Sequence, residues 1–503
     1  MKSLIHNGVL IPNHQPIGLV IKVKGQKIRL NAEQEEMAIA WVKKLGTKYA
    51  KDRAFVKNFF KDFKNALRIS ENLPPEEFDF SEVIAYLERE KRKKETMSKE
   101  EKKLLAQERK AIKEANKAKY GYAIVDGECV EIANYTVEPS SIFMGRGKHP
   151  LRGRWKPGPK QEDIILNLSP DAPRPSGNWK EIVWQPDAMW IACWRDKLTG
   201  KMKYVWLADS APLKQNKEIE KFEKAKELEK YIDIVRSRIW SDLSTNDEKL
   251  RKVATVCYLI DLLKFRVGDE KDKDEADTVG ATTLRKEHIN IHGNLVEFNF
   301  LGKDCVRWKK RATLSNQVLD NLKRYIKMAN DVVFDGISSE DVNRYLSEIM
   351  PGLTAKVFRT YHATRVVREF LEKSKVKPES PEWLKKEVAT MANLQAAIEC
   401  NHKKTMPKNW KESLRKKIQR LKELRKKKMT KKRKEAVQKL RSKIRLMQVT
   451  KGYNLNTSLK SYIDPRVYYE WGKKINFDWK NYYPKSLHKK FEWIENEKTF
   501  VRK

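Results

Sequence analysis

The hydrophobic pattern of this 503-residue chain changes near Pro212. From Tyr120 to Ala208, apolar and aromatic side chains follow the period of two that is typical of strands, in short runs separated by Pro- and Gly-rich segments. After Pro212, apolar side chains recur at helical spacing over Ile219–Leu243 and Glu248–Phe265. One element cannot have both periods. The sequence therefore predicts an α+β protein, with a mixed α/β lobe over residues 1–212 followed by a mainly helical lobe.

Short elements are expected before the strand-rich part of the first lobe. Val9–Leu30 has the pattern of short strands and turns, and Asn31–Leu67 has the pattern of two amphipathic helices that meet near Gly46. Phe80–Lys119 is dominated by Glu and Lys, with sparse Ala, Leu and Ile. This composition predicts one long, solvated helix.

One predicted hairpin interrupts the helical lobe. Leu295–Phe300 and Cys305–Trp308 read as short strands, and the turn Leu301–Asp304 joins them. Helices are expected to resume over Ser315–Cys400. The turn thus places a single lysine, Lys303, at an exposed tip.

The segment Lys411–Gln448 carries 18 Lys and Arg against 3 Glu. Its apolar residues form one stripe in each half, which predicts an antiparallel helical hairpin that is hydrophobic only along its seam. The stripes are Leu414, Ile418, Leu421 and Leu424, then Val437, Leu440, Ile444 and Met447. Such a hairpin is either a solvated element or a DNA contact, and the sequence leaves both open. The aromatic-rich segment Tyr453–Lys503 is expected to form a small packed domain.

The charge of the chain points to a polyanionic partner. Lys and Arg number 107 against 68 Asp and Glu, a formal net charge of +39, so nucleic acid is the first candidate. A membrane surface is the alternative. However, no run approaches the ~18 apolar residues of a spanning helix, and Met1–Gly8 lacks the apolar region of a signal peptide. The sequence therefore predicts a soluble protein that is not secreted.

The sequence lacks the usual signatures of disulfide, metal and nucleotide sites. The chain has five cysteines, an odd number, and no CxxC pair occurs among them. This pattern favours a reducing compartment. No GxxxxGK[ST] loop or HExxH pair occurs. The acidic run Asp269–Glu275 contains interleaved lysines and no ordered ligand spacing, so a solvated loop is favoured over a magnesium site. We expect no cofactor, no nucleotide and no metal.

Three cationic candidates lie at the ends of, or within, apolar helical stretches. Arg266 ends one such stretch, where Gly268 could supply the turn. Arg359 lies inside another and needs an anionic partner there. His402 follows a third. A structural salt bridge for either arginine, or a satisfied core histidine, is the alternative reading of each.

Metal-free phosphoryl transfer on DNA has specific requirements. Cations must hold the non-bridging oxygens as charge develops, and arginine does so with bidentate geometry. A nucleophile and a proton donor for the leaving oxygen complete the set. Tyr462, which lies just before an Asp-Pro pair, and Lys303 are candidates for these two roles, although a lone tyrosine is more often a packing residue.

Several motifs, in one order, resemble the type IB DNA topoisomerases, in particular the eukaryotic nuclear form. The resemblance runs from about His6 to the C-terminus. The motifs are Phe143–Pro150, Gln161–Asn167, Ala276–Gly280, Phe300–Asp304, Gly352–Tyr361, Cys400–His402 and Tyr462–Arg466.

The resemblance implies a role for each catalytic candidate. Tyr462 would attack the scissile phosphate and become joined to the 3′ phosphate, releasing a 5′ hydroxyl. Arg266, Arg359 and His402 match the cationic set of the family. Lys303 matches the hairpin lysine proposed there as the general acid.

The same resemblance implies DNA contacts. Arg146 of the Gly-Arg-Gly motif would enter the minor groove near the cut, with Asp304 and Asn401 nearby. Lys148 and His149, in the same motif as Arg146, are expected to bind DNA as well.

The family fold implied is a two-lobed clamp on double-stranded DNA, acting as a monomer. Residues 1–212 would form the cap lobe, 213–406 the mainly helical, tyrosine-recombinase-like catalytic core, 407–450 a basic antiparallel coiled-coil linker, and 451–503 the C-terminal domain that carries the nucleophile.

Two features depart from the nuclear enzymes. The match begins almost at Met1, without the long charged region that precedes it in those enzymes, so a compact archaeal-like form with a nucleoid location is expected beside a eukaryotic, nuclear one. Ser461 stands before the tyrosine where the nuclear enzymes usually carry Asn, which puts sensitivity to camptothecin-type poisons in doubt.

Two alternative functions remain open at this point. A tyrosine recombinase shares the Arg, Lys, Arg, His and Tyr logic, but it would normally carry a His-x-x-Arg box where this chain has Lys356–Arg359, and it would lack the capping lobe. A non-catalytic architectural DNA-binding protein would also account for the net charge.

Overall fold

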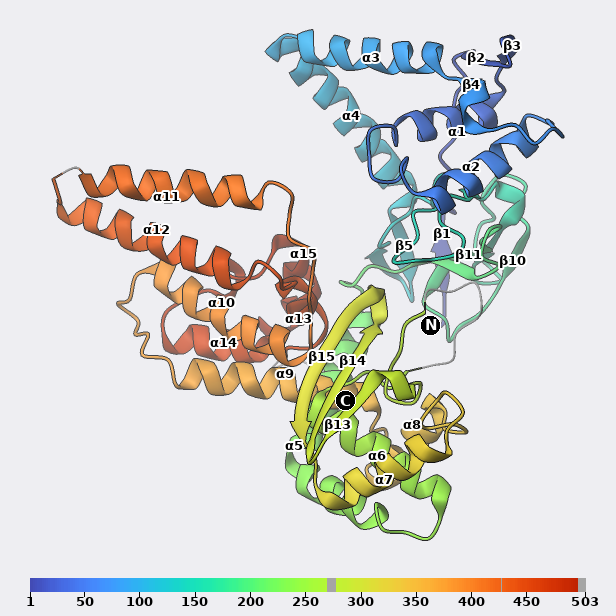
Figure 1. Cartoon of the computed structure of the whole chain (residues 1–503). Helices are drawn as coiled ribbons and strands as arrows, with labels where there is room; N and C mark the ends of the chain where they lie inside the picture. The colour runs from blue at the N-terminus through green and yellow to red at the C-terminus, as the bar shows by residue number, and fades with distance from the viewer. Residues whose placement is uncertain (269–276, 427, 496–503) are drawn as a thin grey trace. The chain divides into compact units, whose positions relative to one another are not determined.

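The computed structural model describes residues 1–268, 277–426 and 428–495, and it divides the chain into two compact units (Figure 1). Unit 1 is Met1–Lys214, and unit 2 begins at Gln215. Helices and small sheets occur in both units, so the α+β prediction is confirmed. None of the described helices combines the length and the apolar character that a membrane span requires.

The strands of unit 1 form several small sheets. A three-stranded sheet has the order β1-β5-β6, a four-stranded sheet the order β10-β9-β11-β12, and a third sheet the order β3-β2-β4, while β7 pairs with β8. The strands are β1 Leu4–His6, β2 Val20–Val23, β3 Gln26–Arg29, β4 Phe78–Asp79, β5 Tyr122–Val125, β6 Glu128–Glu131, β7 Ser141–Ile142, β8 Trp155–Lys156, β9 Ile164–Asn167, β10 Glu181–Val183, β11 Trp190–Arg195 and β12 Met202–Trp206. The strands predicted between Tyr120 and Ala208 are therefore confirmed.

The predicted helix pair of unit 1 is confirmed as α1 (Ala32–Val42) and α2 (Arg53–Ala66). The expectation of one long helix over Phe80–Lys119 is wrong, because α3 (Ser81–Thr96) and α4 (Lys99–Tyr120) form there instead. Ser98 caps α4 by accepting from the Glu101 N–H, and the Glu101 side chain accepts from the Ser98 N–H. A capping box of this kind starts a new helix, and its Ser-x-x-Glu spacing is visible in the sequence.

Unit 2 contains most of the remaining helices. They are α5 Pro212–Asp242, which begins at the boundary, α6 Glu248–Leu263, α7 Asn316–Met328, α8 Ser339–Ile349, α9 Ala355–Glu372, α10 Glu382–Glu399, α11 Trp410–Lys426, α12 Lys431–Val449, α13 Leu455–Ser461, α14 Pro465–Lys474 and α15 Lys485–His488. One hydrophobic core packs parts of α5–α9 against a small sheet. The fully buried Phe265, Phe298 and Phe334 belong to it.

That sheet has three antiparallel strands, β13 (Ile289–His292), β14 (Leu295–Gly302) and β15 (Val306–Thr313). The predicted hairpin is confirmed, since β14 and β15 pair from Leu295↔Thr313 to Gly302↔Val306. Both strands are longer than the sequence suggested, and β13 was not predicted. Its alternating Ile and polar residues, followed by His-Gly-Asn, are the signal that was available.

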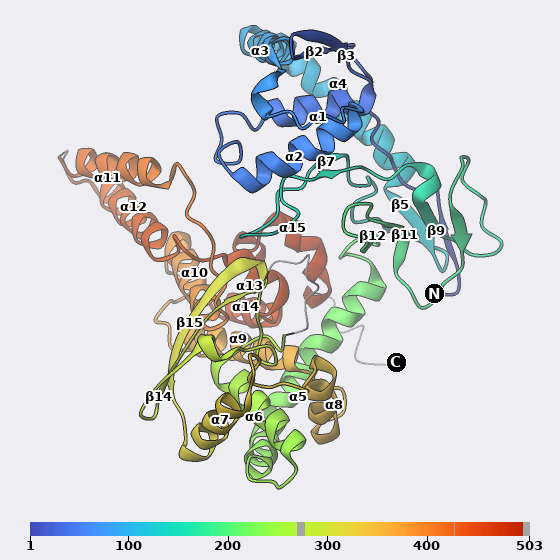
Figure 2. The ribbon, with the colours of Figure 1, turned by 45° about the vertical axis from the view of Figure 1, so that its right-hand side comes forward.

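The basic segment forms the predicted helical hairpin, with α11 lying alongside α12 (Figures 1 and 2). The hairpin is not fully detached, because α12 also packs on α10. Val437, Ser442 and Ile444 of α12 are buried, and Arg445 reaches Glu387 of α10 at 3.4 Å. In α11, by contrast, no residue is buried.

The sequence suggested that the C-terminal segment packs through its own aromatic residues. It does not do so alone. Its aromatic and aliphatic residues share one core with α5, α9 and α10. On α10, Ala389, Ala392 and Ala396 are fully buried. Small residues spaced in this way let neighbouring backbones approach, and the Tyr468 hydroxyl donates to the Ala389 carbonyl at 3.0 Å. The segment that carries Tyr462 is therefore built into unit 2.

Candidate active site

Four of the five catalytic candidates line one cavity of about 430 Å³ in unit 2. They are Arg266, Lys303, Arg359 and Tyr462. The fifth, His402, lies beside this group, with its ring centroid 5.0 Å from that of Tyr462. These residues come from the loop after α6, the β14–β15 tip, α9, the end of α10 and the end of α13.

Backbone interactions fix Tyr462 in place. It follows α13, and its N–H donates to the Ser458 carbonyl at 2.9 Å. The Thr364 hydroxyl of α9 donates to the Tyr462 carbonyl at 3.2 Å and accepts from the Asp464 N–H at 3.1 Å. Asp464 then caps α14, with Pro465 in its first turn. Tyr462 is only 8% exposed, and what remains accessible lines the cavity.

Arg359 is 1% exposed, and the predicted anionic partner is absent among the described residues. Its Nη1 donates to the Lys264 carbonyl at the end of α6, and its Nη2 donates to the Cys400 carbonyl at the end of α10 at 2.9 Å. Carbonyls at helix C-termini carry partial negative charge, so they replace the carboxylate. The guanidinium carbon lies 4.9 Å from the Tyr462 ring centroid.

Arg266 lies in a loop that a close backbone contact holds. Lys264 ends α6 in the left-handed region at φ 58°, and the expected turn at Gly268 follows it with φ 97°. The Arg266 carbonyl accepts from the Ala281 N–H at 2.9 Å. A Cβ on Gly280 would lie 2.3 Å from the Gly268 Cα, so glycine is required where these two loops meet.

The two arginines set the electrostatics of the site. Burial disfavours ionisation of the Tyr462 phenol, but the charges of Arg359 and Arg266 outweigh it and lower the pKa of Tyr462 below its ordinary value. Burial, followed by the Arg359 charge, lowers the pKa of Arg266. Two cations held this close repel each other in the absence of an anion. The site is therefore suited to an anionic ligand.

His402 is neutral in this structure, which corrects the expectation that it adds positive charge. Burial, and then the charges of Arg359 and Arg266, lower its pKa to about 3. Its Nε2 lies 3.3 Å from Arg359 Nη2, which can only donate, so Nε2 is the acceptor. Its Nδ1 lies 2.8 Å from the Ser458 hydroxyl and carries the proton in this assignment.

Lys303 lies at the exposed tip of the β14–β15 hairpin and reaches the cavity from there. The tip is tight, because Asp304 and Cys305 both have positive φ, at 67° and 56°. Asp304 is exposed. Asn401 is only 8% exposed, and its Nδ2 donates to the Arg307 carbonyl at 3.1 Å. Asn401 thus ties the end of α10 to β15.

The predicted contacts Arg146, Lys148 and His149 lie in unit 1, in the loop between β7 and β8. Arg146 and Lys148 are exposed, whereas His149 is half-buried and packs edge-on against Phe143 at 4.8 Å. Gly145 has φ 53°, and a Cβ there would lie 2.9 Å from the His149 Cβ. Glycine therefore permits the sharp turn that presents Arg146.

The amino-acid sequence matches one family along nearly its whole length. Models described as the eukaryotic DNA topoisomerase I DNA-binding fragment, its catalytic core and a C-terminal topoisomerase domain match residues 1–207, 210–436 and 434–501. DNA topoisomerase 1 of Homo sapiens is 34% identical over 98% of this chain and 70% of its own length. The chain belongs to the eukaryotic DNA topoisomerase I family.

Other relatives give the same result. DNA topoisomerase 1 of Caenorhabditis elegans is 34% identical over 98% of this chain, which spans 66% of the worm protein's length. A protein of Pan troglodytes named DNA topoisomerase I, mitochondrial, is 31% identical over 98% of this chain and 89% of its own length.

Membership of this topoisomerase family makes the chain a type IB DNA topoisomerase, an isomerase that binds DNA and relaxes its supercoils. A tyrosine recombinase and a non-catalytic architectural protein are not favoured, because the match covers the DNA-binding fragment and the catalytic core together. Among the described residues, no group of three or more His, Cys, Asp or Glu side chains is arranged to hold a metal ion. The acidic run at residues 269–275 lies outside the described part of the chain.

Sequence reasoning missed Lys310 of β15, which joins two of the elements that build this topoisomerase site. Its Nζ donates to the Glu399 carbonyl at 2.9 Å and to the Leu263 carbonyl at 3.3 Å. The available signal was strand register, since Lys310 shares the inward face of β15 with the buried Trp308. A lysine on the buried face of a strand needs partners there.

Proposed function

We propose that Tyr462 is the nucleophile that opens one DNA strand. Its phenol loses a proton to water, and the oxygen attacks the scissile phosphorus. The bond from phosphorus to the 5′ oxygen breaks, leaving a 3′-phosphotyrosyl bond and a 5′ hydroxyl. After strand rotation, that hydroxyl attacks the same phosphorus and releases Tyr462. Bond energy is conserved in the covalent link, so no nucleotide is needed.

The cations stabilise the pentacoordinate transition state in this proposal. Arg266 and Arg359 hold the non-bridging oxygens with N–H donors whose charge does not change. The Nε of Arg359 has no hydrogen-bond partner among the described residues, so one donor is uncommitted. Burial, and then the two arginine charges, lower the pKa of His402; a bound phosphate would oppose the second of these causes and so favour a proton on Nε2, which would become a third donor.

Lys303 is the proposed general acid. The 5′ oxygen is a poor leaving group unless a proton reaches it as the bond to phosphorus breaks. Lys303 approaches the cavity from the hairpin tip, on an element separate from those that hold Tyr462. This arrangement suits a group that must meet the leaving oxygen and not the attacking one.

We further propose how the rest of the chain serves double-stranded DNA. A monomer would clamp the duplex between residues 1–212 and 213–406, with 407–450 as a coiled-coil linker and 451–503 as the C-terminal domain. Arg146, Lys148, His149 and Asp304 would contact DNA. Asn401 is more useful as a support of the hairpin, because its amide already binds the Arg307 carbonyl.

The proposed location follows from the substrate. A chain of this family works where genomic DNA is, in the nucleus if its source is eukaryotic and at the nucleoid if archaeal. A mitochondrial relative exists in Pan troglodytes, so organellar DNA is a third setting for this chemistry.

One observation carries the mechanism, namely the position of Tyr462. Its ring lies 4.9 Å from the Arg359 guanidinium and 5.0 Å from the His402 ring, in a cavity that Arg266 and Lys303 also line. The test is plasmid relaxation in EDTA without ATP. We expect both positive and negative supercoils to relax, and complete loss of activity on chelation would contradict the proposal.

A further inference from the structure

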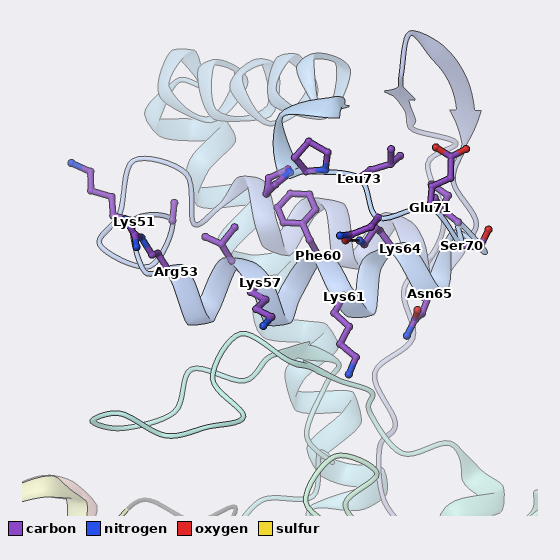
Figure 3. A pocket seen from close by; sticks show the side chains of 16 residues that line it. Lys51, Arg53, Lys57, Phe60, Lys61, Lys64, Asn65, Ser70, Glu71 and Leu73 are labelled. Atoms are coloured by element: carbon purple, nitrogen blue, oxygen red, sulfur yellow. Dashed lines mark hydrogen bonds between the residues drawn. The ribbon is translucent and has the colours of Figure 1, made fainter.

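One cavity lies in unit 1, on elements that carry none of the catalytic candidates. It has a volume of about 730 Å³ and lies between α2 and residues 69–75 (Figure 3). We call it the α2 groove. Ligand pockets span roughly 300–1,000 Å³. The groove is thus large enough for several side chains of a peptide.

Four of the cations that line the α2 groove lack an ion partner among the described residues. They are Lys51, Arg53, Lys57 and Lys61. Glu71 is the one carboxylate on its lining, and it already binds Lys24. The groove therefore holds uncompensated positive charge.

The cations on α2 lower the stability of this helix, and its packing in the core does not require them. Arg53, Lys57 and Lys61 are spaced four residues apart on one helix, where like charges destabilise the helix. The opposite face of α2 already supplies its packing through Phe55, Phe59 and Phe63. An anionic ligand in the groove would remove the repulsion.

The floor of the α2 groove is apolar. Phe60 is buried at 4% exposure, with its ring packed against Trp41 and Phe78, and it lines the groove on the side of Leu73 (Figure 3). Val56 and Ile69 are half-buried beside it. A floor of this kind selects an apolar side chain, whereas a DNA duplex offers little beyond thymine methyl groups.

We propose that the α2 groove binds an acidic peptide segment of a partner protein, with carboxylates on the cationic rim and one large apolar side chain on the Phe60 floor. Charge complementarity supplies the attraction, and the floor supplies selectivity. This inference does not depend on the mechanism at Tyr462.

Fluorescence polarisation on the full chain tests the proposal. The probe is a labelled hexapeptide of five acidic residues and one phenylalanine, and its partner probe has alanine in place of phenylalanine. We expect the first to bind at least ten-fold more tightly. The double variant Lys57→Glu, Lys61→Glu should lose at least ten-fold in affinity. The matched control Lys102→Glu, Lys103→Glu, on exposed α4, makes the same charge change and should lose little.

Three results would overturn it. Equal losses in the two double variants would show non-specific electrostatics. Equal binding of the two peptides would remove the role of the floor. A larger loss of duplex DNA binding than of peptide binding in the groove variant would make the α2 groove a DNA surface instead. If the double variant fails to fold, Leu73→Ser against the two peptides decides the role of the floor.

A different observation carries a second inference, which rests on the proposed function of Arg359. The C-terminal ends of α6 and α10 meet at this site. Two cations each donate a hydrogen bond to one carbonyl at each helix end, and at each end the two carbonyls belong to consecutive residues. Arg359 takes those of Lys264 and Cys400, while Lys310 takes those of Leu263 and Glu399. We infer that Lys310 is a positioning residue, which fixes both helix ends and thereby the guanidinium of Arg359.

Lys310 also ties these ends to the strand that leads to Lys303. Both residues belong to the β14–β15 hairpin, whose tip has a tight turn. The groups that face the Lys310 ammonium are Glu399, Lys264, Arg359 and the Cys400 thiol. Burial, offset in part by Glu399, lowers its pKa to about 8. Its charge should therefore fall in mildly alkaline solution.

Single-turnover cleavage tests this second inference. Lys310→Met should cleave at least ten-fold more slowly, with unchanged duplex affinity. Lys310→Arg should restore most of the rate, and the ratio of wild-type to Lys310→Arg rates should fall between pH 7 and 9.5. Lys309→Met is the matched control, because Lys309 lies on the outer face and pairs with Glu297 at 3.3 Å.

Wild-type rates in Lys310→Met, or a pH-independent ratio, would overturn the positioning role. If Lys310→Met does not fold, the pH comparison with Lys310→Arg decides the question. Failure of the proposed function looks different, since cleavage would then persist in Tyr462→Phe whatever residue stands at position 310.

Discussion

The basic hairpin α11–α12 and the segment α13–α14 adjoin in sequence but differ in how deeply their residues are buried. No residue of α11 is buried, whereas Tyr462, Tyr468 and Trp471 of the second segment are all under 9% exposed. Charge attracts DNA over the ~8–10 Å of a Debye length and needs little geometry. Chemistry needs side chains held to within about 0.5 Å. The difference teaches that abundant lysines serve affinity, while packing serves catalysis.

The change with the largest expected effect removes the nucleophile from the packed segment. Tyr462→Phe should abolish plasmid relaxation and leave duplex affinity intact, because one oxygen is lost and the cationic surface is unchanged. Relaxation gels and a filter-binding assay measure the two quantities. Relaxation at the wild-type rate would remove Tyr462 from its role.

The next effect concerns a cation that is buried rather than exposed. Arg359→Ala should slow cleavage by about 10²–10³, the scale for one transition-state donor, with little change in duplex affinity. Single-turnover cleavage and equilibrium binding measure these. A loss of affinity that matched the loss of rate would place Arg359 with the binding lysines instead.

The effect at Lys303 should depend on the leaving group. Lys303→Ala should slow cleavage of a normal 5′ oxygen by about 10², since proton transfer contributes on this scale. A 5′-bridging phosphorothiolate leaves without a proton and should be cleaved almost as well by the variant as by the wild type. Equal defects on the two substrates would exclude the general-acid role.

The exposed hairpin should contribute to binding alone. Replacing residues 411–436 by a short flexible linker removes 14 Lys and Arg with 3 Glu, but it keeps the part of α12 that packs on α10. Cleavage should be intact, and the slope of log K against log salt should fall by about 0.9 for each lost phosphate contact. An unchanged slope would make the hairpin a solvated spacer. A loss of cleavage would show that it helps to seat Tyr462.

The smallest effect is on stability and comes from the buried His402. Its pKa is about 3 in the folded chain against 6.5 as an ordinary histidine. Between these values the unfolded chain binds the extra proton, so the free energy of unfolding falls as pH falls from 6.5. The slope from one site is at most about 1.4 kcal/mol per pH unit.

Denaturant unfolding at several pH values measures this slope. His402→Gln should lower the slope of the unfolding free energy against pH by up to the amount that one proton contributes. His292→Gln, at an exposed position, should leave the slope unchanged. An identical pH dependence in the two variants would show that His402 is not held neutral by its burial.

The same contrast explains how far sequence reasoning reached. The basic hairpin follows from charge and apolar spacing, whereas the packing of α12 on α10 does not. Tyr462 and Arg359 were placed by motif, but their partners were not. Arg359 binds the carbonyls of Lys264 and Cys400, and backbone groups leave no signature in side-chain patterns.

Burial is the other quantity that the sequence conceals. His402 looks like a cation in the chain and is neutral in the fold, because the end of α10 and the two arginines surround it. The C-terminal aromatics looked sufficient for a core of their own, yet α9 and α10 complete it. In both cases, residues distant in sequence decide the outcome.

The most direct test of the central claim is to map the covalent DNA–protein bond. A suicide duplex labelled on either side of the cut is incubated with the chain in EDTA, and the adduct is digested and sequenced. We predict that the protein stays joined to the 3′ phosphate through Tyr462, with a free 5′ hydroxyl on the other fragment. Attachment to the 5′ end, attachment through another residue, or a requirement for metal would contradict the account.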